Sequence, residues 1–275
     1  MAKKDRTKKR RKSRAAGADV FKLYQDSVQC PEAEIHFFDR VFKKHRRRKA
    51  LTMKEDFCGT AFLSAEWAKT NPRRIAVGVD LDGPTLDYAR DIVLAGETDD
   101  VRKRVKLLQA NVNDVTRPKV ELSCALNFSY CIFKKREELV HYFKQAYKGL
   151  EDDGMLVTDL FGGTEAIDVI EEDRKLNGFT YVWDQADYNP ITNEILCHIH
   201  FKFPDGSRIN KAFTYDWRLW SIPEVRECME EAGFPKVEVY WEPEDEADDG
   251  EILDYRFTEK EENQEGWLVY VVGIK

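Results

Sequence analysis

Apolar runs that alternate with helical patterns constrain the fold of this chain most strongly. The stretch "RIAVGVDLD" at 74–82 is nearly continuous in apolar residues, which is typical of a strand buried on both faces of a parallel sheet. Similar strands are predicted at 51–55, 105–112, 122–130 and 155–163, and helices at 60–69, after Asp82 and at 135–150. This order predicts an α/β fold with a doubly wound, seven-stranded, Rossmann-like sheet and right-handed crossovers.

The pattern changes near residue 163. Three stretches, "FTYVWDQADYNP", "NEILCHIHFKF" and "RINKAFTYDWRLW", predict an inserted three-stranded antiparallel sheet with period-two alternation. In the middle strand Cys197 and Ile199 share one face, and His198 and His200 lie on the other, where we expect them to be exposed. A helix at 222–232 and strands at 236–241 and 267–275 then return the chain to the first sheet, and the last strand is expected to be antiparallel.

These patterns divide the chain into four parts. Residues 1–19 are expected to be a basic disordered tail, and residues 20–50 a helical lid with helices at 20–29 and from Pro31. Its last segment, "KKHRRRKA" at 43–50, is interpreted as a solvated link. The Rossmann-like core then comprises 51–163 and 215–275, and the substrate-capping insertion comprises 164–214.

Charge is distributed unevenly along the chain. The net charge is -7, yet residues 1–14 carry nine Lys and Arg against Asp5, so the remainder carries about -15 by subtraction. Such a basic block repels itself and predicts disorder. It suits contact with RNA, an anionic surface or a nuclear import receptor, and equally a solubilising tail without a specific partner. The acidic remainder argues against a nucleic-acid groove on the folded body.

The apolar content is arranged as in a soluble protein. No run is long enough to cross a bilayer, and no apolar segment at the N-terminus resembles a signal peptide. We therefore expect no membrane insertion and a cytoplasmic protein, or a nuclear one if the source is eukaryotic. The six cysteines form no Cys-x-x-Cys pair, which indicates buried free thiols rather than zinc or disulfides. Monomer and homodimer both remain open.

The loop "KEDFCGTAFL" at 54–63 falls where the first strand should turn into the first helix. A dinucleotide-binding turn normally carries three glycines, and this loop offers only Gly59. The side chains of Phe57 and Ala61 would crowd a pyrophosphate. A carboxylate a few ångströms from a phosphate is repelled by about 1 kcal/mol even in water. The adjacent carboxylates Glu55 and Asp56 therefore disfavour NAD, FAD and nucleoside triphosphates.

A cofactor with a ribose, no phosphate and a positive charge fits this loop better. S-adenosylmethionine has these features. Asp80 ends the second strand about 20 residues beyond Gly59, where an acidic residue commonly holds ribose hydroxyls. A loop that binds nothing is the alternative.

From about residue 50 onward, the chain resembles the class I S-adenosylmethionine-dependent methyltransferases. The family motif acid-x-Gly-x-Gly-x-Gly maps onto 55–61, and "GVDLDGPTLDYAR" matches the segment with the ribose-binding acid. "LLQANVND" matches the adenine segment, where Asn111 replaces the usual Asp and Val112 would offer its backbone to the ring. "EDFCGTA", "NFSYCIF" and "FTYDWRLW" resemble an uncharacterised bacterial-type subgroup of that family.

The resemblance implies S-adenosylmethionine as the cofactor. Tyr24 is expected to close over it from the lid, although an ordinary packed tyrosine is the alternative. We expect the cofactor site to comprise Tyr24, Glu55, Phe57, Cys58, Gly59, Asp80, Leu81, Asn111, Val112 and Asn127.

Three residues are candidates for the chemistry. "NFSY" at 127–130 loosely resembles the Asn-Pro-Pro-Tyr motif of amino-methyltransferases and keeps Asn127 and Tyr130. Asn127 would orient an amine lone pair, and Tyr130 would place its ring near the sulfonium, where cation–π attraction contributes about 0.5–2 kcal/mol. Asp159 is expected to rim the acceptor pocket with Phe161. Packing at the strand end is the alternative for "NFSY".

Three further residues are candidates for contacting the substrate. His198 is a base or ligand candidate, but no third ligand has a suggestive spacing, so no metal is predicted. Arg218 would bind a carboxylate or phosphate of the acceptor, or else pair with Asp216. Trp220 follows in the same segment.

The sequence therefore predicts a methyltransferase that transfers a methyl group to a nitrogen or oxygen atom of a small molecule by in-line displacement. Three alternatives remain open at this point. The first is a methyltransferase whose substrate is RNA or a ribosomal protein. The second is a non-catalytic module that has lost its cofactor, and the third is a nicotinamide oxidoreductase.

Overall fold

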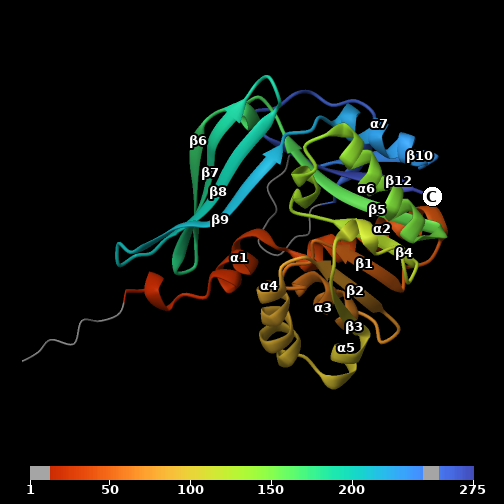
Figure 1. The fold of residues 1–275 in the computed structure, drawn as a ribbon, viewed down its shortest axis with the longest axis horizontal. Coiled ribbons are helices and arrows are strands. Elements are labelled where there is room, and N and C mark those ends of the chain that lie inside the picture. Colours follow the sequence, from red (N-terminus) through yellow and green to blue (C-terminus); the bar gives the residue numbers. More distant parts are fainter. Residues whose placement is uncertain (1–12, 244–253) are drawn as a thin grey trace, which may run out of the picture.

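The structure is a computed structural model that describes residues 13–243 and 254–275. Residues 1–12 of the predicted tail and 244–253 of the predicted acidic loop lie outside the described residues. The described chain forms an eight-stranded sheet covered by helices and a separate four-stranded sheet beside it (Figure 1). None of the helices in these two ranges combines the length and the apolar character needed to span a membrane.

The large sheet has the strand order β11-β10-β12-β5-β4-β1-β2-β3. Its parallel strands are β1 (Thr52–Asp56), β2 (Ile75–Asp80), β3 (Val105–Gln109), β4 (Val120–Ala125) and β5 (Leu150–Gly162). Strand β12 (Trp267–Ile274) runs antiparallel between β5 and β10 (Lys236–Trp241). The predicted Rossmann-like sheet with an antiparallel last strand is confirmed.

One strand of this sheet was not predicted. Strand β11 (Arg256–Thr258) pairs with β10 and makes eight strands instead of seven. It lies within the acidic stretch predicted as a loop, because an edge strand of three partly exposed residues has no apolar run to reveal it.

Helices cover both faces of the large sheet. Helices α6 (Arg136–Gly149) and α7 (Ile222–Ala232) pack against one face, and α2 (Pro31–Arg46) and α3 (Phe62–Lys69) pack against the other. Helix α4 (Gly83–Tyr88) is capped by Asp82, whose carboxylate accepts the N–H of Thr85, and α5 (Asp99–Arg104) precedes β3. Short helical turns occupy Ala15–Gly17, Ala89–Val93, Leu94–Gly96, Val112–Asp114, Ser129–Ile132 and Glu165–Ile167.

The two predicted N-terminal helices are present as α1 (Val20–Val28) and α2. Ile35, Phe38 and Phe42 are buried, as their helical spacing predicts. The interpretation of 43–50 as a link is wrong in its first half, because α2 continues to Arg46. Basic residues suit the last turn of a helix, and Lys44 and His45 both contact the buried carboxylate of Glu238.

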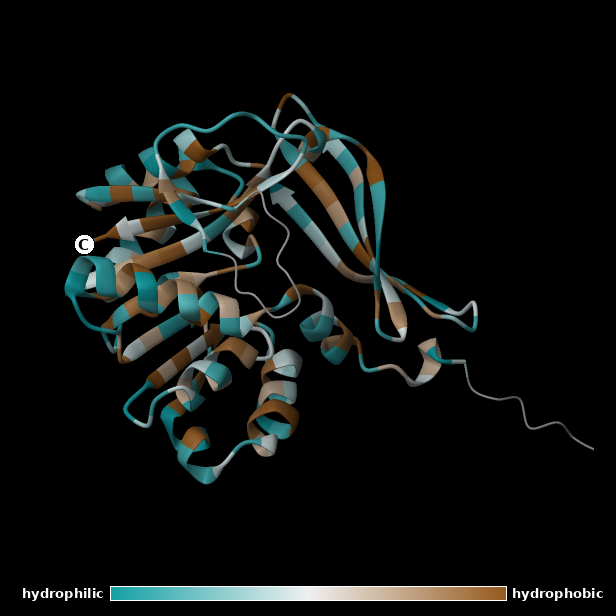
Figure 2. Ribbon diagram, turned by 180° about the vertical axis from the view of Figure 1, so that it is seen from behind, coloured by the Kyte–Doolittle hydropathy of each residue, from teal (hydrophilic) through white to brown (hydrophobic). Residues whose placement is uncertain are grey.

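The second sheet has the order β6-β7-β8-β9. Its strands are β6 (Ile170–Leu176), β7 (Phe179–Asn189), β8 (Glu194–Lys202) and β9 (Arg208–Arg218). The prediction of three strands missed β6, because "IEEDRKL" is an exposed, charged edge strand without apolar alternation. Figure 2 shows apolar and polar bands alternating along the longer strands. Because β9 ends at Arg218, the sheet continues beyond the predicted boundary at 214.

Candidate functional site

The loop after β1 has an unusual backbone. Phe57, Gly59 and Ala61 have φ angles of 58°, 51° and 54°, in the left-handed region. These are the three positions at which the family motif carries glycine. Holding a residue with a side chain in this region costs roughly 1–2 kcal/mol. The loop therefore keeps a glycine-type backbone even though two of the three glycines are replaced.

The two replacing side chains point to different places. Ala61 is fully buried with Cys58 and Leu86, so its methyl group does not enter the cavity described below. The ring of Phe57 packs against Phe133 and Tyr142 at centroid distances of 6.1 and 5.9 Å, and Phe57 also lines the cavity. The expected crowding of the loop is therefore confined to Phe57.

Asp80 connects this loop to the end of β2. Its Oδ2 accepts the backbone N–H of Gly59 at 2.8 Å, and its Oδ1 accepts that of Asp82 at 2.9 Å. The loop also packs closely on β2, because a Cβ atom at Gly78 would lie 2.8 Å from Sγ of Cys58. Asp80 is therefore held in one orientation at the carboxyl end of β2, where ligands of doubly wound sheets bind.

The two acids that open the loop are committed elsewhere. Glu55 is buried and accepts hydrogen bonds from the backbone N–H and the hydroxyl of Ser64. Burial raises the pKa of Glu55 to about 7. Asp56 is buried on the opposite face of β1, where it pairs with Lys54 at 3.2 Å and accepts the hydroxyl of Tyr142 at 3.0 Å. Neither acid lines the cavity, and Asp56 is already neutralised by Lys54.

A second left-handed turn lies at the end of β4. Asn127 and Phe128 have φ angles of 55° and 57°. Together with Phe57 and Ala61 they make four of the seven described non-glycine residues with such angles. Strained residues of this kind cluster at functional sites, where the surrounding structure holds them in place.

Asp159 holds this second turn. Its two carboxylate oxygens accept the backbone N–H groups of Asn127 and Phe128 at 2.7 and 2.9 Å. Burial raises the pKa of Asp159 to about 7, opposed by these two hydrogen bonds. The expectation that Asp159 rims the acceptor pocket is corrected, because its side chain lies beneath the turn, whereas Phe161, two residues further along β5, lines the second cavity described below. Its role is to position the turn.

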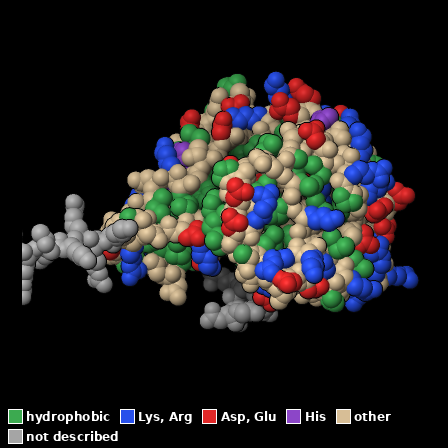
Figure 3. Space-filling view, turned by 60° about the horizontal axis from the view of Figure 1, so that its bottom comes forward, with side chains coloured by type: hydrophobic (Ala, Val, Ile, Leu, Met, Phe, Trp, Pro, Cys, Tyr) green, Lys and Arg blue, Asp and Glu red, His purple; other side chains and the backbone are tan. Residues whose placement is uncertain are grey.

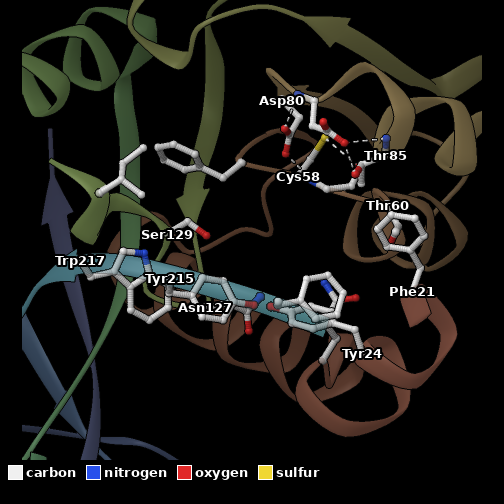
Figure 4. Close-up of a pocket in the computed structure, with 16 residues that line it drawn as sticks. Phe21, Tyr24, Cys58, Thr60, Asp80, Thr85, Asn127, Ser129, Tyr215 and Trp217 are labelled. Atoms are coloured by element: carbon white, nitrogen blue, oxygen red, sulfur yellow. Dashed lines mark hydrogen bonds between the residues drawn. The ribbon is translucent and has the colours of Figure 1, made fainter. Parts of the chain in front are cut away.

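A cavity of about 370 Å³ lies over the two turns. In Figure 4, Asp80 lies across this cavity from Tyr215 and Trp217 of β9, and Phe21 and Tyr24 of α1 approach from the lid. Its lining residues are Phe21, Tyr24, Gln29, Phe57, Cys58, Gly59, Thr60, Asp80, Asp82, Thr85, Asn127, Ser129, Ile132, Phe213, Tyr215 and Trp217. We call this space the cofactor cavity.

A second cavity of about 200 Å³ adjoins the first. Its lining residues are Tyr24, Val28, Asn127, Phe128, Phe161, Tyr181, Trp183, Ile199, Tyr215 and Trp217. We call it the aromatic chamber, since most of these side chains are aromatic. Four of them also line the cofactor cavity: Tyr24, Asn127, Tyr215 and Trp217. Figure 3 shows hydrophobic side chains gathered between the second sheet and the core.

Helix α1 joins the surroundings of both cavities. The amide of Gln25 donates to the hydroxyl of Thr60 in the β1 loop at 2.8 Å. The ring of Tyr24 packs on Phe213 of β9 at a centroid distance of 4.9 Å. Burial raises the pKa of Tyr24, so its hydroxyl is neutral. The hydroxyl of Tyr88 also donates to Asp19, the residue before α1, at 2.6 Å. Helix α1 is therefore held by contacts with three different segments, and its function as a lid stays a prediction.

The charge around both cavities is negative. Among the described residues, no Lys, Arg or His lines either cavity, whereas Asp80 and Asp82 line the first. Glu34 of α2 is only 8% exposed, and its carboxylate makes no hydrogen bond or ion pair within the described parts of the chain. Burial raises its pKa to about 8, and the nearby Glu55 and Asp159 add to the shift. A cationic ligand is favoured here, and a phosphorylated one is not.

Tyr130 does not reach either cavity. Its side chain is fully buried in the core beneath α6, with its ring 6.0 Å from that of Phe143. The expectation of a ring beside the sulfonium is corrected, because the short helical turn Ser129–Ile132 directs Ser129 and Ile132 toward the cofactor cavity and Tyr130 into the core.

Arg218 and Trp220 are also engaged elsewhere. Arg218 pairs with Glu224 at 2.7 Å and donates to the carbonyl of Lys134, with its guanidinium 3.8 Å above the ring of Trp220. Trp220 is buried and donates to the carbonyl of Phe133 at 3.2 Å. The predictions that Arg218 binds an acceptor anion or pairs with Asp216 are therefore wrong. Neither Arg218 nor Trp220 lines the cofactor cavity or the aromatic chamber.

The two histidines of β8 face away from the site. Ile199 lines the aromatic chamber, so His198 and His200 point to the other side of the sheet. They are 3% and 4% exposed, which corrects the expectation of exposed histidines. Nδ1 of His198 lies 2.9 Å from Oγ1 of Thr214, and burial lowers the pKa of His198.

His200 also belongs to a group of metal-ligating type with Glu171 and Asp184. Its Nδ1 accepts the backbone N–H of Lys211 at 2.7 Å, and its Nε2 lies 2.9 Å from Asp184. A neutral imidazole that accepts at Nδ1 carries its proton on Nε2, so no lone pair is left for an ion. The ring therefore stabilises a bulge in β9, where Lys211 has a φ of 49°.

The two predicted adenine contacts, Asn111 and Val112, and the predicted cofactor-site residue Leu81 lie outside the cofactor cavity. Asn111 accepts the backbone N–H of Asn113 and begins the turn 112–114, Val112 is buried in the core, and Leu81 is 63% exposed. Sequence reasoning missed seven lining residues: Phe21, Gln29, Thr60, Thr85, Ser129, Ile132 and Phe213. Five of them lie inside the quoted motifs but were not recognised as site residues, and only Phe21 and Gln29 lie outside any motif. Tyr215 and Trp217 had a usable signal, because they alternate with Asp216 and Arg218 along one strand.

Solved structures share this arrangement. A S-adenosylmethionine-dependent methyltransferase from Clostridium acetobutylicum matches with a TM-score of 0.64 and 14% identity, over 91% of this chain and 96% of its own. The sugar N-methyltransferase KedS8 from Streptoalloteichus sp. matches with a TM-score of 0.61 and 18% identity, over 100% of this chain and 98% of its own. The fold is that of the class I S-adenosylmethionine-dependent methyltransferases.

A third solved structure has a bound ligand. CalS10, an amino pentose methyltransferase from Micromonospora echinaspora, bound to S-adenosylmethionine, matches with a TM-score of 0.63 and 13% identity, over 93% of this chain and 97% of its own. No protein-family model matches the chain, and no curated protein matches its sequence.

Proposed function

We propose that the protein is a S-adenosylmethionine-dependent methyltransferase that acts on a nitrogen or oxygen atom of a small molecule. The observation that carries this proposal is the loop after β1, which keeps left-handed angles at all three glycine positions of the family motif although Phe57 and Ala61 carry side chains. A loop without function would have no reason to retain this strain. The similar solved structures, including two that act on amino sugars or sugars by their descriptions, support the same activity.

The residues around the cofactor cavity fit S-adenosylmethionine. The carboxylate of Asp80 retains free lone pairs for the ribose hydroxyls, and the acidic surroundings favour its positive charges. The cavity volume of about 370 Å³ falls in the range of small-molecule sites. The cofactor supplies an activated methyl group on a positively charged sulfur.

The chain's own contribution is then alignment and exclusion of water. The two turns hold Gly59 and Asn127 at the wall of the cofactor cavity. Tyr24, Tyr215 and Trp217 line both cavities and so enclose the junction between them. Holding two reactants in the reactive geometry supplies roughly 7–11 kcal/mol of a barrier. The side-chain amide of Asn127, at that junction, would orient the acceptor atom.

Binding of the demethylated product, S-adenosylhomocysteine, tests this proposal. We expect micromolar affinity by isothermal titration calorimetry on the full chain, and stabilisation against heat by about 2.7 kcal/mol at a hundredfold excess over the dissociation constant. NAD is the matched control and should give no stabilisation. Stronger stabilisation by NAD would favour an oxidoreductase, and absence of binding by either would favour a module that has lost its cofactor.

A further inference from the structure

The aromatic chamber differs from the cofactor cavity in having no charged residue in its lining. Seven of its ten lining side chains are aromatic, and Asn127 is the one side chain with an amide. The rings support one another: Tyr215 stacks on Trp217 at a centroid distance of 4.3 Å, and Phe161 meets Trp183 edge-on at 6.3 Å. The wall of the chamber is therefore preorganised.

The buried acids beneath this wall have no cationic partner among the described residues. Asp159 lies directly under Asn127 and Phe128, two residues that line the chamber. No described Lys or Arg forms an ion pair with Asp159, Glu34 or Glu55. Aromatic faces attract cations through their quadrupole, and this attraction grows when water is excluded. Aromatic rings over buried acids form a complementary surface for a cation.

The chamber also lacks a base. A hydroxyl acceptor must lose its proton during methylation, so it needs a group that can receive that proton. Burial raises the pKa of Tyr181 to about 12 and raises those of Tyr24 and Tyr215, which leaves all three hydroxyls protonated. Asp159 does not line the chamber, because its carboxylate lies beneath the turn and accepts the backbone N–H groups of Asn127 and Phe128. Within the described residues, nothing that lines the chamber can take a proton from an alcohol.

From these observations we infer that the acceptor is an amine, and that the aromatic chamber holds its nitrogen and the positive charge the nitrogen carries after methylation. This inference rests on the proposed function. The nitrogen lone pair forms the new bond to the methyl carbon, the carbon–sulfur bond breaks with its electrons left on sulfur, and the positive charge passes to nitrogen. The amine reacts in its neutral form, so no proton has to leave during this step, which agrees with a chamber that has no base.

A pair of probes that differ only in charge tests the inference. Choline carries a trimethylammonium group, and dimethylbutanol is its neutral isostere with carbon in place of nitrogen. We measure the affinity of each by calorimetry on the full chain saturated with S-adenosylhomocysteine. Choline is expected to bind about tenfold more tightly than the isostere. Equal binding of the two probes, or tighter binding of the isostere, would overturn the inference.

A substitution locates the preference in the chamber. Trp183 lines the chamber and not the cofactor cavity, so Trp183→Leu is expected to reduce the preference for choline to about threefold or less while S-adenosylhomocysteine binds as before. Trp267→Leu is the matched control, because Trp267 is partly buried and lines neither cavity, and it should leave the preference unchanged. An unchanged preference in Trp183→Leu would contradict the location.

The two levels of the proposal fail in different ways. If S-adenosylhomocysteine binds and choline shows no preference, the methyltransferase proposal stands and the amine acceptor is rejected. If S-adenosylhomocysteine does not bind, both are rejected. The comparison of the two probes on the unsubstituted chain needs no variant, so it decides the inference even if Trp183→Leu fails to fold.

Discussion

The two adjoining cavities are built by different means. The cofactor cavity lies on backbone: two left-handed turns at the ends of β1 and β4, each held by a carboxylate, Asp80 or Asp159. The aromatic chamber is built mainly from side chains that the second sheet and α1 bring over the core. A backbone-built site suits a ligand that stays constant across a family, whereas a wall of side chains can change with the acceptor and leave the fold intact.

The largest effect is expected in the cofactor cavity. Asp80→Ala removes the carboxylate that orients the loop and would accept the ribose hydroxyls, and hydrogen bonds to a charged group contribute about 1.5–3 kcal/mol. We expect the affinity for S-adenosylhomocysteine to fall by about a hundredfold in calorimetry. Asp87→Ala, on the exposed surface of α4, is the control and should bind normally. Normal binding by Asp80→Ala would mean that the ribose does not lie at the end of β2.

The next prediction concerns the acids that lie beneath both cavities. Burial raises the pKa values of Glu34, Glu55 and Asp159 in the folded chain to about 8, 7 and 7. The folded state then binds more protons than the unfolded state. The stability from these groups is present in full below their ordinary pKa values and is lost as the pH rises through the raised ones. We expect the free energy of unfolding of the unliganded chain to fall between about pH 5 and about pH 8.

Glu34→Gln should flatten this dependence on pH, by on the order of 2 kcal/mol over the same range. Other groups also act on this cluster and remain in the variant; they are Tyr24, Tyr255, Tyr270 and Cys124, besides Glu55 and Asp159. Glu32→Gln, an exposed residue in the same turn of α2, is the matched control. Denaturant unfolding at several pH values gives the slopes, and equal slopes in both variants would show that Glu34 is not the titrating group.

A smaller effect measures the strain in the β1 loop. Ala61→Gly and Ala65→Gly each remove one fully buried methyl group, but Ala61 is left-handed and Ala65 lies inside α3. Relief of the left-handed strain should make Ala61→Gly less destabilising than Ala65→Gly by about 1–2 kcal/mol. Urea unfolding measures the two free energies. The same loss in both variants would remove the evidence for strain in the loop.

The last prediction is that removing the N-terminal segment leaves the affinity for S-adenosylhomocysteine unchanged. Contacts with the cofactor cavity begin at Phe21, so deletion of residues 1–12 should leave the affinity for S-adenosylhomocysteine within about twofold of that of the full chain. Calorimetry on the shortened chain checks this. A marked loss would extend the site to a segment outside the described residues and would revive the RNA or ribosomal-protein alternative.

The sequence predicted the backbone around the cofactor cavity better than the side chains that form the aromatic chamber. The order of strands and helices, the capping of α4 by Asp82 and the position of Asp80 all follow from local patterns. The contacts of Glu55, Arg218 and Trp220 do not, because each depends on a partner in another element: Ser64 of α3, Glu224 of α7 and the carbonyl of Phe133. Period-two alternation put His198 on one face of its strand but could not say which face the core would cover.

The four side chains shared by the two cavities have a thermodynamic consequence. Tyr24, Asn127, Tyr215 and Trp217 border both spaces, so a molecule that orders them in one space changes the freedom left to them in the other. Linkage then requires reciprocity: whatever factor the first occupant applies to the affinity of the second, the second returns to the first. We therefore expect two ligands that fill both spaces at once to bind with coupled affinities and not independently.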